Sequence, residues 1–222
     1  ARDSGDSVHA AIEAVLLGNV PTSHHDAANG IALWLSQFVT SRQALHVEAA
    51  LAWDAATGKA RRLGIGRAAY ENALPNERCG TADCMAVIDG VLHCWDWKSG
   101  EFGAQKARMQ LRTLAVMGAA WLSLDTVRTF SVLVDATGNE APRVVVTEEL
   151  GPLDLAEHAS ALRDGFDRVK DANPVLGEHC NDCFCGQRGT CPERASLVES
   201  MSVSANLVQL GRGNPLTAPL QS

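Results

Sequence analysis

The fold is decided by residues 80–98, which read GTADCMAVIDGVLHCWDWK. Two apolar runs flank Asp89-Gly90, and this dipeptide is the strongest short signal for a β-hairpin with a two-residue turn. Because such a turn fixes the register of the strands that it joins, Ile88 is expected to face Val91. Every residue further along the two strands then has a defined partner.

Counting outward from the turn, Asp83 lies directly opposite Asp96, with the two β-carbons about 5 Å apart. Side chains alternate between faces along a strand, so Lys98 shares the face of Asp96 and lies diagonal to Asp83. Two ionised carboxylates that oppose each other among apolar residues repel, and their burial is costly unless a cation compensates. Lys98 supplies one positive charge, and a divalent metal is expected to supply the rest.

Carboxylate oxygens are hard ligands, which suit Mg²⁺ or Mn²⁺. A metal held by Asp83 and Asp96 would bind a scissile phosphate, lower the pKa of a bound water and stabilise the charge of the transition state. Lys98 would orient the water or the phosphate. The alternative is a structural salt bridge between Lys98 and one aspartate. It accounts for an isolated D-x-K pattern but not for the second, opposed carboxylate, so we predict a metal site.

Around the hairpin, the spacing of apolar residues predicts further helices and strands. The helices are expected at 7–17, 27–39, 105–121 and 153–170, and the strands at 45–53, 129–135 and 143–147. Helices that flank a mixed β-sheet define an α/β domain, which we expect to span 1–172. A small C-terminal metal lobe rich in cysteine (173–203) and a loosely ordered tail (204–222) are expected to follow.

Composition indicates a soluble cytoplasmic protein of 222 residues without a membrane partner. No apolar run approaches the length of a membrane span, and the first residues lack the apolar segment of a secretory signal. The net charge of −7 opposes unaided binding to nucleic acid, which usually requires a basic face. An acidic chain can still act on DNA if its carboxylates hold metal cations, or if a partner supplies most of the affinity.

The quoted hairpin also carries a resemblance to a known family. Residues 80–83 (GTAD) and 96–100 (DWKSG) resemble the GxxD…(D/E)xK-(T/S)-G core of RecB-type nuclease domains, in the PD-(D/E)XK superfamily. The resemblance implies a restriction-endonuclease-like core in which the acidic pair binds metal and Lys98 assists catalysis. Residues 5–13 (GDSVHAAIE) match the family's early helix, which implies that His9 is a further metal ligand and leaves the role of Glu13 open.

In this family the helix after the lysine carries a glutamine that is followed by leucine and, four residues on, by tyrosine. Gln110 matches the glutamine and is a candidate catalytic residue, whereas Gln105 fits less well. Leu114 stands where the family has tyrosine, which weakens a DNA contact at that position. Glu48 lies on a neighbouring predicted strand, where an ordinary strand glutamate is the simpler interpretation.

Four of the seven cysteines gather in one short segment, as Cys180, Cys183, Cys185 and Cys191. In a chain without an export signal, this density indicates metal binding more than disulfides. The segment resembles the cysteine tail of nucleases related to AddB and to the CRISPR-adaptation and phage-type exonucleases. In those proteins three C-terminal cysteines join one N-terminal cysteine around a [4Fe–4S] cluster.

Residues 1–78 contain no cysteine, so the usual fourth ligand is missing from this sequence. Either the chain given begins after it, or Cys185 replaces it, or the lobe binds Zn²⁺ with Cys185 or His179 as the fourth ligand. A reduced loop without metal is the remaining alternative. The other three cysteines are expected to be small strand residues and not ligands; they are Cys79, Cys84 and Cys94.

The sequence therefore predicts a Mg²⁺- or Mn²⁺-dependent deoxyribonuclease that hydrolyses phosphodiester bonds, as an exonuclease in DNA processing, repair, recombination, or phage- or CRISPR-related metabolism. One alternative is a non-catalytic module that clamps DNA within a helicase–nuclease type of complex. The intact set of two carboxylates and a lysine opposes it. The other alternative is a nuclease that acts on RNA, which nothing in the sequence excludes.

Overall fold

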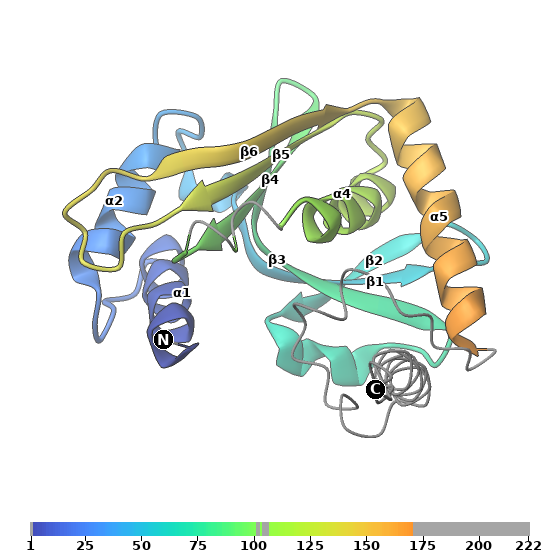
Figure 1. The fold of residues 1–222 in the computed structure, drawn as a ribbon, viewed down its shortest axis with the longest axis horizontal. Coiled ribbons are helices and arrows are strands. Elements are labelled where there is room, and N and C mark those ends of the chain that lie inside the picture. Colours follow the sequence, from blue (N-terminus) through green and yellow to red (C-terminus); the bar gives the residue numbers. More distant parts are fainter. Residues whose placement is uncertain (1, 101–102, 104–106, 171–222) are drawn as a thin grey trace, which may run out of the picture. The chain divides into compact units, whose positions relative to one another are not determined.

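The computed structural model describes residues 2–100, 103 and 107–170, and within them six strands form one mixed sheet (Figure 1). The sheet order is β2-β1-β3-β4-β5-β6, and every pair of neighbours is antiparallel except β4 with β5. The strands are β1 (His46–Asp54), β2 (Ala60–Ile65), β3 (Glu77–Ile88), β4 (Val91–Lys98), β5 (Val127–Leu133) and β6 (Arg143–Leu150).

The helices are α1 (Arg2–Leu16), α2 (His25–Leu35), α4 (Arg108–Leu122) and α5 (Pro152–Lys170), with short 3₁₀ helices η1 (Arg42–Ala44) and η2 (Arg67–Asn72). Parallel strands need a crossover connection, and α4 supplies it between β4 and β5. A mixed sheet with flanking helices confirms the predicted α/β class. The chain divides into two compact units, Ala1–Gly165 and Phe166–Ser222, and the sheet belongs to the first. No helix among the described residues is long and apolar enough to cross a bilayer.

Two helical layers cover opposite faces of the sheet. The core cluster of α1 and α2 includes Trp95 and Trp97 of β4. Alternation along β4 therefore sends Leu92 to the other face, where α4 packs. The approach of α4 is close, since a Cβ on Gly118 would lie 2.7 Å from Leu92 Cδ2. Alternation likewise places Asp96 and Lys98 on the α4 face.

The structure confirms the predicted hairpin. Asp89 and Gly90 have φ angles of 50° and 79°, as a type I′ turn requires at both central positions. The observed pairs run from Ile88–Val91 to Cys84–Trp95, in the predicted register.

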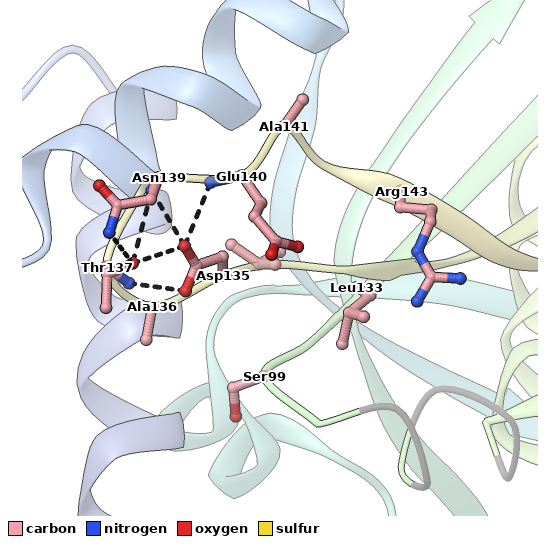
Figure 2. A pocket seen from close by; sticks show the side chains of 10 residues that line it. Ser99, Leu133, Asp135, Ala136, Thr137, Asn139, Glu140, Ala141 and Arg143 are labelled. Carbon is pink, nitrogen blue, oxygen red and sulfur yellow. Dashed lines mark hydrogen bonds between the residues drawn. The ribbon is translucent and has the colours of Figure 1, made fainter.

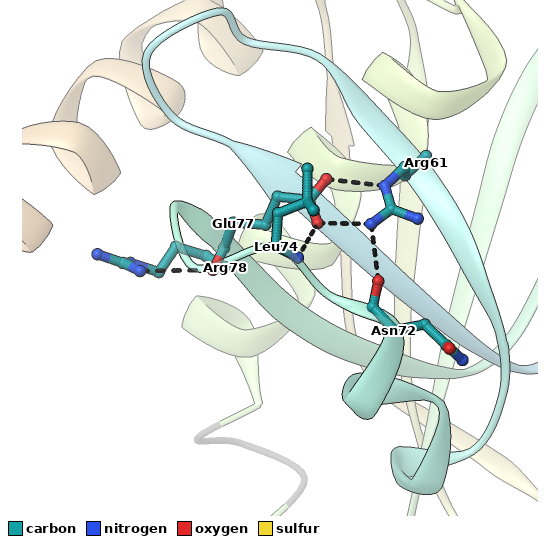
Figure 3. Close-up of polar contacts among 5 residues, drawn as sticks. All are labelled: Arg61, Asn72, Leu74, Glu77 and Arg78. Atoms are coloured by element: carbon teal, nitrogen blue, oxygen red, sulfur yellow. Dashed lines mark hydrogen bonds and ion pairs between the residues drawn. The ribbon is translucent and has the colours of Figure 1, made fainter.

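Residues 55–76, between β1 and β3, contain β2 and η2. An ion pair ties this segment to the start of β3 (Figure 3). The Arg61 guanidinium donates two hydrogen bonds of 2.8 Å to Glu77, and also donates to the carbonyl of Asn72. The Leu74 amide donates to the same carboxylate, at 2.7 Å. These contacts tie the end of η2 to β2 and β3.

One predicted helix is shorter than expected, because α2 ends at Leu35 and not at Val39. The Ser36 hydroxyl donates to the carbonyl of Leu33 at 2.7 Å, and the Phe38 amide bonds to the Leu35 carbonyl. Serine that bonds to nearby backbone in this way competes with regular helical hydrogen bonds. The predicted cysteine lobe and tail lie outside the described residues.

Candidate metal centre

The strands β3 and β4 part at the two predicted aspartates. Their last observed pair is Cys84–Trp95, one residue before Asp83 and Asp96 would meet. There the Asp83 carboxylate accepts a hydrogen bond of 2.8 Å from the Trp97 amide. A side chain thus takes the place of a backbone partner, which holds the Asp83 carboxylate at the mouth of the gap between the strands.

The ladder between β1 and β3 is interrupted at the same level. Val47–Cys84 and Ala49–Ala82 are paired, and the position between them sets Glu48 against Asp83. Glu48 has a φ of 46°, a left-handed conformation that costs energy for a residue other than glycine. Such strain persists only where the surrounding structure enforces it, and it concentrates at functional sites.

The first helix completes a group of three metal-ligand side chains. Val8 and Ile12 are buried in the core, which fixes α1 over the sheet and turns His9 toward β3. One ligand atom each from His9, Glu48 and Asp83 lies within 4.8 Å of the others. The His9 Nδ1 is 3.5 Å from Asp83 Oδ2. The predicted ligands His9 and Asp83 therefore lie together, joined by a glutamate that the sequence did not favour.

Burial shifts each of these three side chains toward its neutral form. The pKa of Glu48 is raised to about 7, first by burial and then by the charges of Asp83 and Glu13. Burial also raises the pKa of Asp83. The pKa of His9 is lowered by burial and by the Lys98 charge, which favours the neutral imidazole that binds metal. The carboxylates are short of positive charge, and a divalent cation fits this shortage.

Asp96 and Lys98 form a buried ion pair beside the group of three. The Lys98 ammonium lies 2.8 Å from each Asp96 oxygen and donates a hydrogen bond to Oδ1. Oδ2 is also buried and is within ion-pair distance, but it accepts no hydrogen bond. Burial and the charge of Asp83 raise the pKa of Asp96. The salt bridge considered from sequence is thus present, and a second acidic residue still acts on it.

The remaining candidates fall in different places. Gln110 is exposed in the first turn of α4, outside the group of three ligands. Leu114 is buried and would touch a Cβ on Gly80, so it is a core residue, in keeping with its departure from the family pattern. Glu13 is half-buried on α1, and its charge reaches Glu48.

The hairpin cysteines lie on strands, as the sequence predicts. Cys84 and Cys94 are buried, Cys79 is partly exposed, and burial raises the pKa of each thiol. Within the described residues, none of them joins a group of metal-ligand atoms. The four cysteines predicted to bind a cluster lie outside the described residues; they are Cys180, Cys183, Cys185 and Cys191.

The structure shows an α/β protein in which His9, Glu48 and Asp83 form a candidate metal-binding group. Comparison with protein-family models finds no match, and no curated protein matches either. Among solved structures, SSO0001 is similar at 17% identity over 74% of this chain, with a TM-score of 0.38. The match spans 66% of SSO0001, just under two thirds of its length.

Proposed function

We propose that this protein is a Mg²⁺- or Mn²⁺-dependent deoxyribonuclease that acts at DNA ends, built on a restriction-endonuclease-like core. The observation that carries the proposal is the meeting of His9, Glu48 and Asp83 beside the buried Asp96–Lys98 pair. The C-terminal cysteines would hold a [4Fe–4S] cluster, or alternatively Zn²⁺, by resemblance to exonucleases with such tails.

The donor set suits a hard divalent cation. Carboxylates from Glu48 and Asp83 supply oxygen ligands, and the neutral His9 imidazole supplies nitrogen. Asp96 stands next to them, with both of its carboxylate oxygens 2.8 Å from the Lys98 ammonium. When bound, the metal supplies Lewis-acid activation of a phosphate and of a water molecule. Hydrolysis of a phosphodiester is the chemistry that needs both.

The protein's own residues have separate tasks in this proposal. Lys98 carries a positive charge that is three-quarters buried but still reachable, since its side chain is 24% exposed. An ammonium at this place holds Asp96 ionised and orients the phosphate or the attacking water. The Trp97 amide fixes the Asp83 carboxylate. Together these contacts set the ligands before the substrate arrives.

A non-catalytic DNA clamp needs none of this arrangement. Strain at Glu48 and buried carboxylates with raised pKa values lower the stability of a metal-free protein. A clamp would gain affinity from exposed cations, whereas this centre concentrates anions. The arrangement therefore favours catalysis over clamping.

Cleavage of end-labelled single- and double-stranded DNA, and of RNA of the same sequence, tests the proposal directly. We expect cleavage of DNA with Mg²⁺ or Mn²⁺, none with EDTA, and none by a folded Asp96→Ala variant. Glu149→Ala is the matched control, because Glu149 is an exposed acid on β6 whose partner is Arg128. Cleavage that resists EDTA, or that survives Asp96→Ala, would overturn the mechanism. Preferential cleavage of RNA would replace the proposed substrate.

A further inference from the structure

A polar cavity of about 520 Å³ opens beside the end of β4 (Figure 2). Ser99 lines it from below, and the connection between β5 and β6 forms its wall. In Figure 2 the side chains of Leu133, Glu140 and Arg143 point to the same side of this connection, toward Ser99. Small-molecule sites in proteins have volumes of roughly 300–1,000 Å³, so the cavity has the size of a nucleotide-binding pocket.

The wall of the cavity is held in one conformation. The Asp135 carboxylate accepts hydrogen bonds from the amides of Thr137, Asn139 and Glu140, and from the Thr137 hydroxyl. These bonds hold the pKa of Asp135 below its usual range. From α1 and α2, His24 bridges the Ser7 hydroxyl and the carbonyl that follows Asp135, at 3.0 and 2.9 Å. A site that is formed before binding loses less entropy when a ligand enters.

The register of the sheet places this cavity next to the candidate catalytic lysine. Lys98 pairs with Leu133 across the parallel ladder, and Leu133 pairs with Arg143 across the antiparallel one. Paired residues on adjacent strands point to the same face, so these three side chains form a row on the face of Asp96. The row spans two strand spacings, about 10 Å. The Val134 amide, which donates to the Lys98 carbonyl at 2.8 Å, fixes the alignment.

We propose that the cavity is a subsite for the nucleotide next to the scissile phosphate. The inference rests on the proposed function and adds the path of the DNA strand. From the metal centre the strand would pass over Lys98 and Leu133, with its base in the cavity and its next phosphate beside Arg143. The base meets a hydrogen-bonding group, since Glu140 lines the cavity and points toward Ser99 (Figure 2). The Asp135 carboxylate accepts hydrogen bonds from its own loop, and these donors weaken its repulsion of the DNA strand.

Two substrates distinguish binding in this subsite from cleavage at the candidate metal centre. A short single-stranded oligodeoxynucleotide reaches from the metal centre to the cavity, whereas bis(4-nitrophenyl) phosphate carries a phosphodiester without a base. We expect Arg143→Ala to raise KM for the oligonucleotide about tenfold and to leave cleavage of the small diester unchanged, because one good nucleotide contact is worth about that much. Arg143→Lys should restore part of the loss. Arg128→Ala, which removes an exposed cation from the other end of β5, should have no effect.

A single abasic site, moved along the oligonucleotide, then locates the base. The wild-type protein should lose about tenfold in kcat/KM when the abasic site is at one position next to the scissile bond. Glu140→Trp, at a side chain that points toward Ser99 in Figure 2, should fill the cavity and remove this dependence. Equal KM values for Arg143→Ala and wild type, or no effect of the abasic site at any position, would overturn the subsite while leaving the nuclease intact. If the wild type cleaves neither substrate with Mg²⁺ or Mn²⁺, the proposed function fails and the subsite fails with it.

Discussion

Replacing Glu48 by glutamine should stabilise the metal-free protein above neutral pH and remove most of the stabilisation that metal provides. Glu48 has a pKa of about 7 in the folded chain against an ordinary value of 4.5, because burial and the Asp83 charge oppose its ionisation. A folded-state pKa above the unfolded one means that the folded protein binds the proton more tightly. The free energy of unfolding therefore falls as pH rises from about 4.5 to about 7.

The size of the effect follows from this shift. One pKa unit corresponds to about 1.4 kcal/mol, so the shift from 4.5 to about 7 would give about 3 kcal/mol at pH 8 without solvent screening. Glu48 is only half-buried, and solvent screening reduces the effect to about 1–2 kcal/mol. For a chain of this size, such a change raises Tm by about 2–8 °C. Glutamine keeps the shape and the backbone strain of the glutamate, so the charge is what changes.

Thermal unfolding at pH 5 and pH 8, with EDTA or with Mg²⁺, measures the effect. With EDTA, Glu48→Gln should have a higher Tm than wild type at pH 8. At pH 5, where the wild-type carboxyl is protonated, the two Tm values should be close. With Mg²⁺ the wild type should gain more than the variant, since a ligand stabilises only the state that binds it. Glu71→Gln, an exposed change on η2, is the matched control. A variant that is no more stable than wild type at pH 8, or that gains as much from Mg²⁺, would refute the assignment.

Three further predictions separate the remaining roles. Lys98→Ala should lower kcat about a hundredfold or more while metal affinity, measured by calorimetry, changes little, because an ammonium cannot ligate a cation. His9→Ala should lower both, and equal losses of metal affinity in the two variants would contradict these roles. Metal affinity of the wild type should fall as pH drops from 8 to 5.5, since protons compete for the raised-pKa carboxylates. Removing metal from the C-terminal cysteines should increase hydrogen exchange in residues 173–203 before it affects the hairpin. The iron or zinc content of anaerobically purified protein identifies that metal. Finding neither metal indicates a reduced cysteine loop.

The sequence predicted the part of the fold that local rules determine. Asp89-Gly90 specifies a turn with both φ angles positive, and that turn alone fixes the pairs from Ile88–Val91 to Cys84–Trp95. Helices with a clear apolar stripe were likewise found. Their ends were less certain, as at α2, which ends at Leu35 where the Ser36 hydroxyl bonds back to the Leu33 carbonyl.

Contacts between distant segments were the part that could not be predicted. Glu48 joins the metal centre through the pairing of β1 with β3, and no turn in the sequence sets that register. Its left-handed backbone is also invisible in the sequence, since glutamate has no preference for it. The cavity beside Ser99 depends on the parallel register of β4 and β5, which no turn in the sequence specifies. Such long-range pairings follow from the packing of the whole sheet.

Under the proposed function, the balance of charge at the candidate metal centre would explain how an acidic chain acts on a polyanion. The charged side chains that act on its carboxylates are Glu13, Glu48, Asp83, Asp96, Lys98 and Arg67. With every carboxylate ionised, four negative charges face two positive ones, and a phosphodiester approaching this place would be repelled. One divalent cation cancels the difference. Under the proposed function, the metal would be required for the substrate to enter as well as for its cleavage, and the net charge of −7 would not argue against DNA at this site.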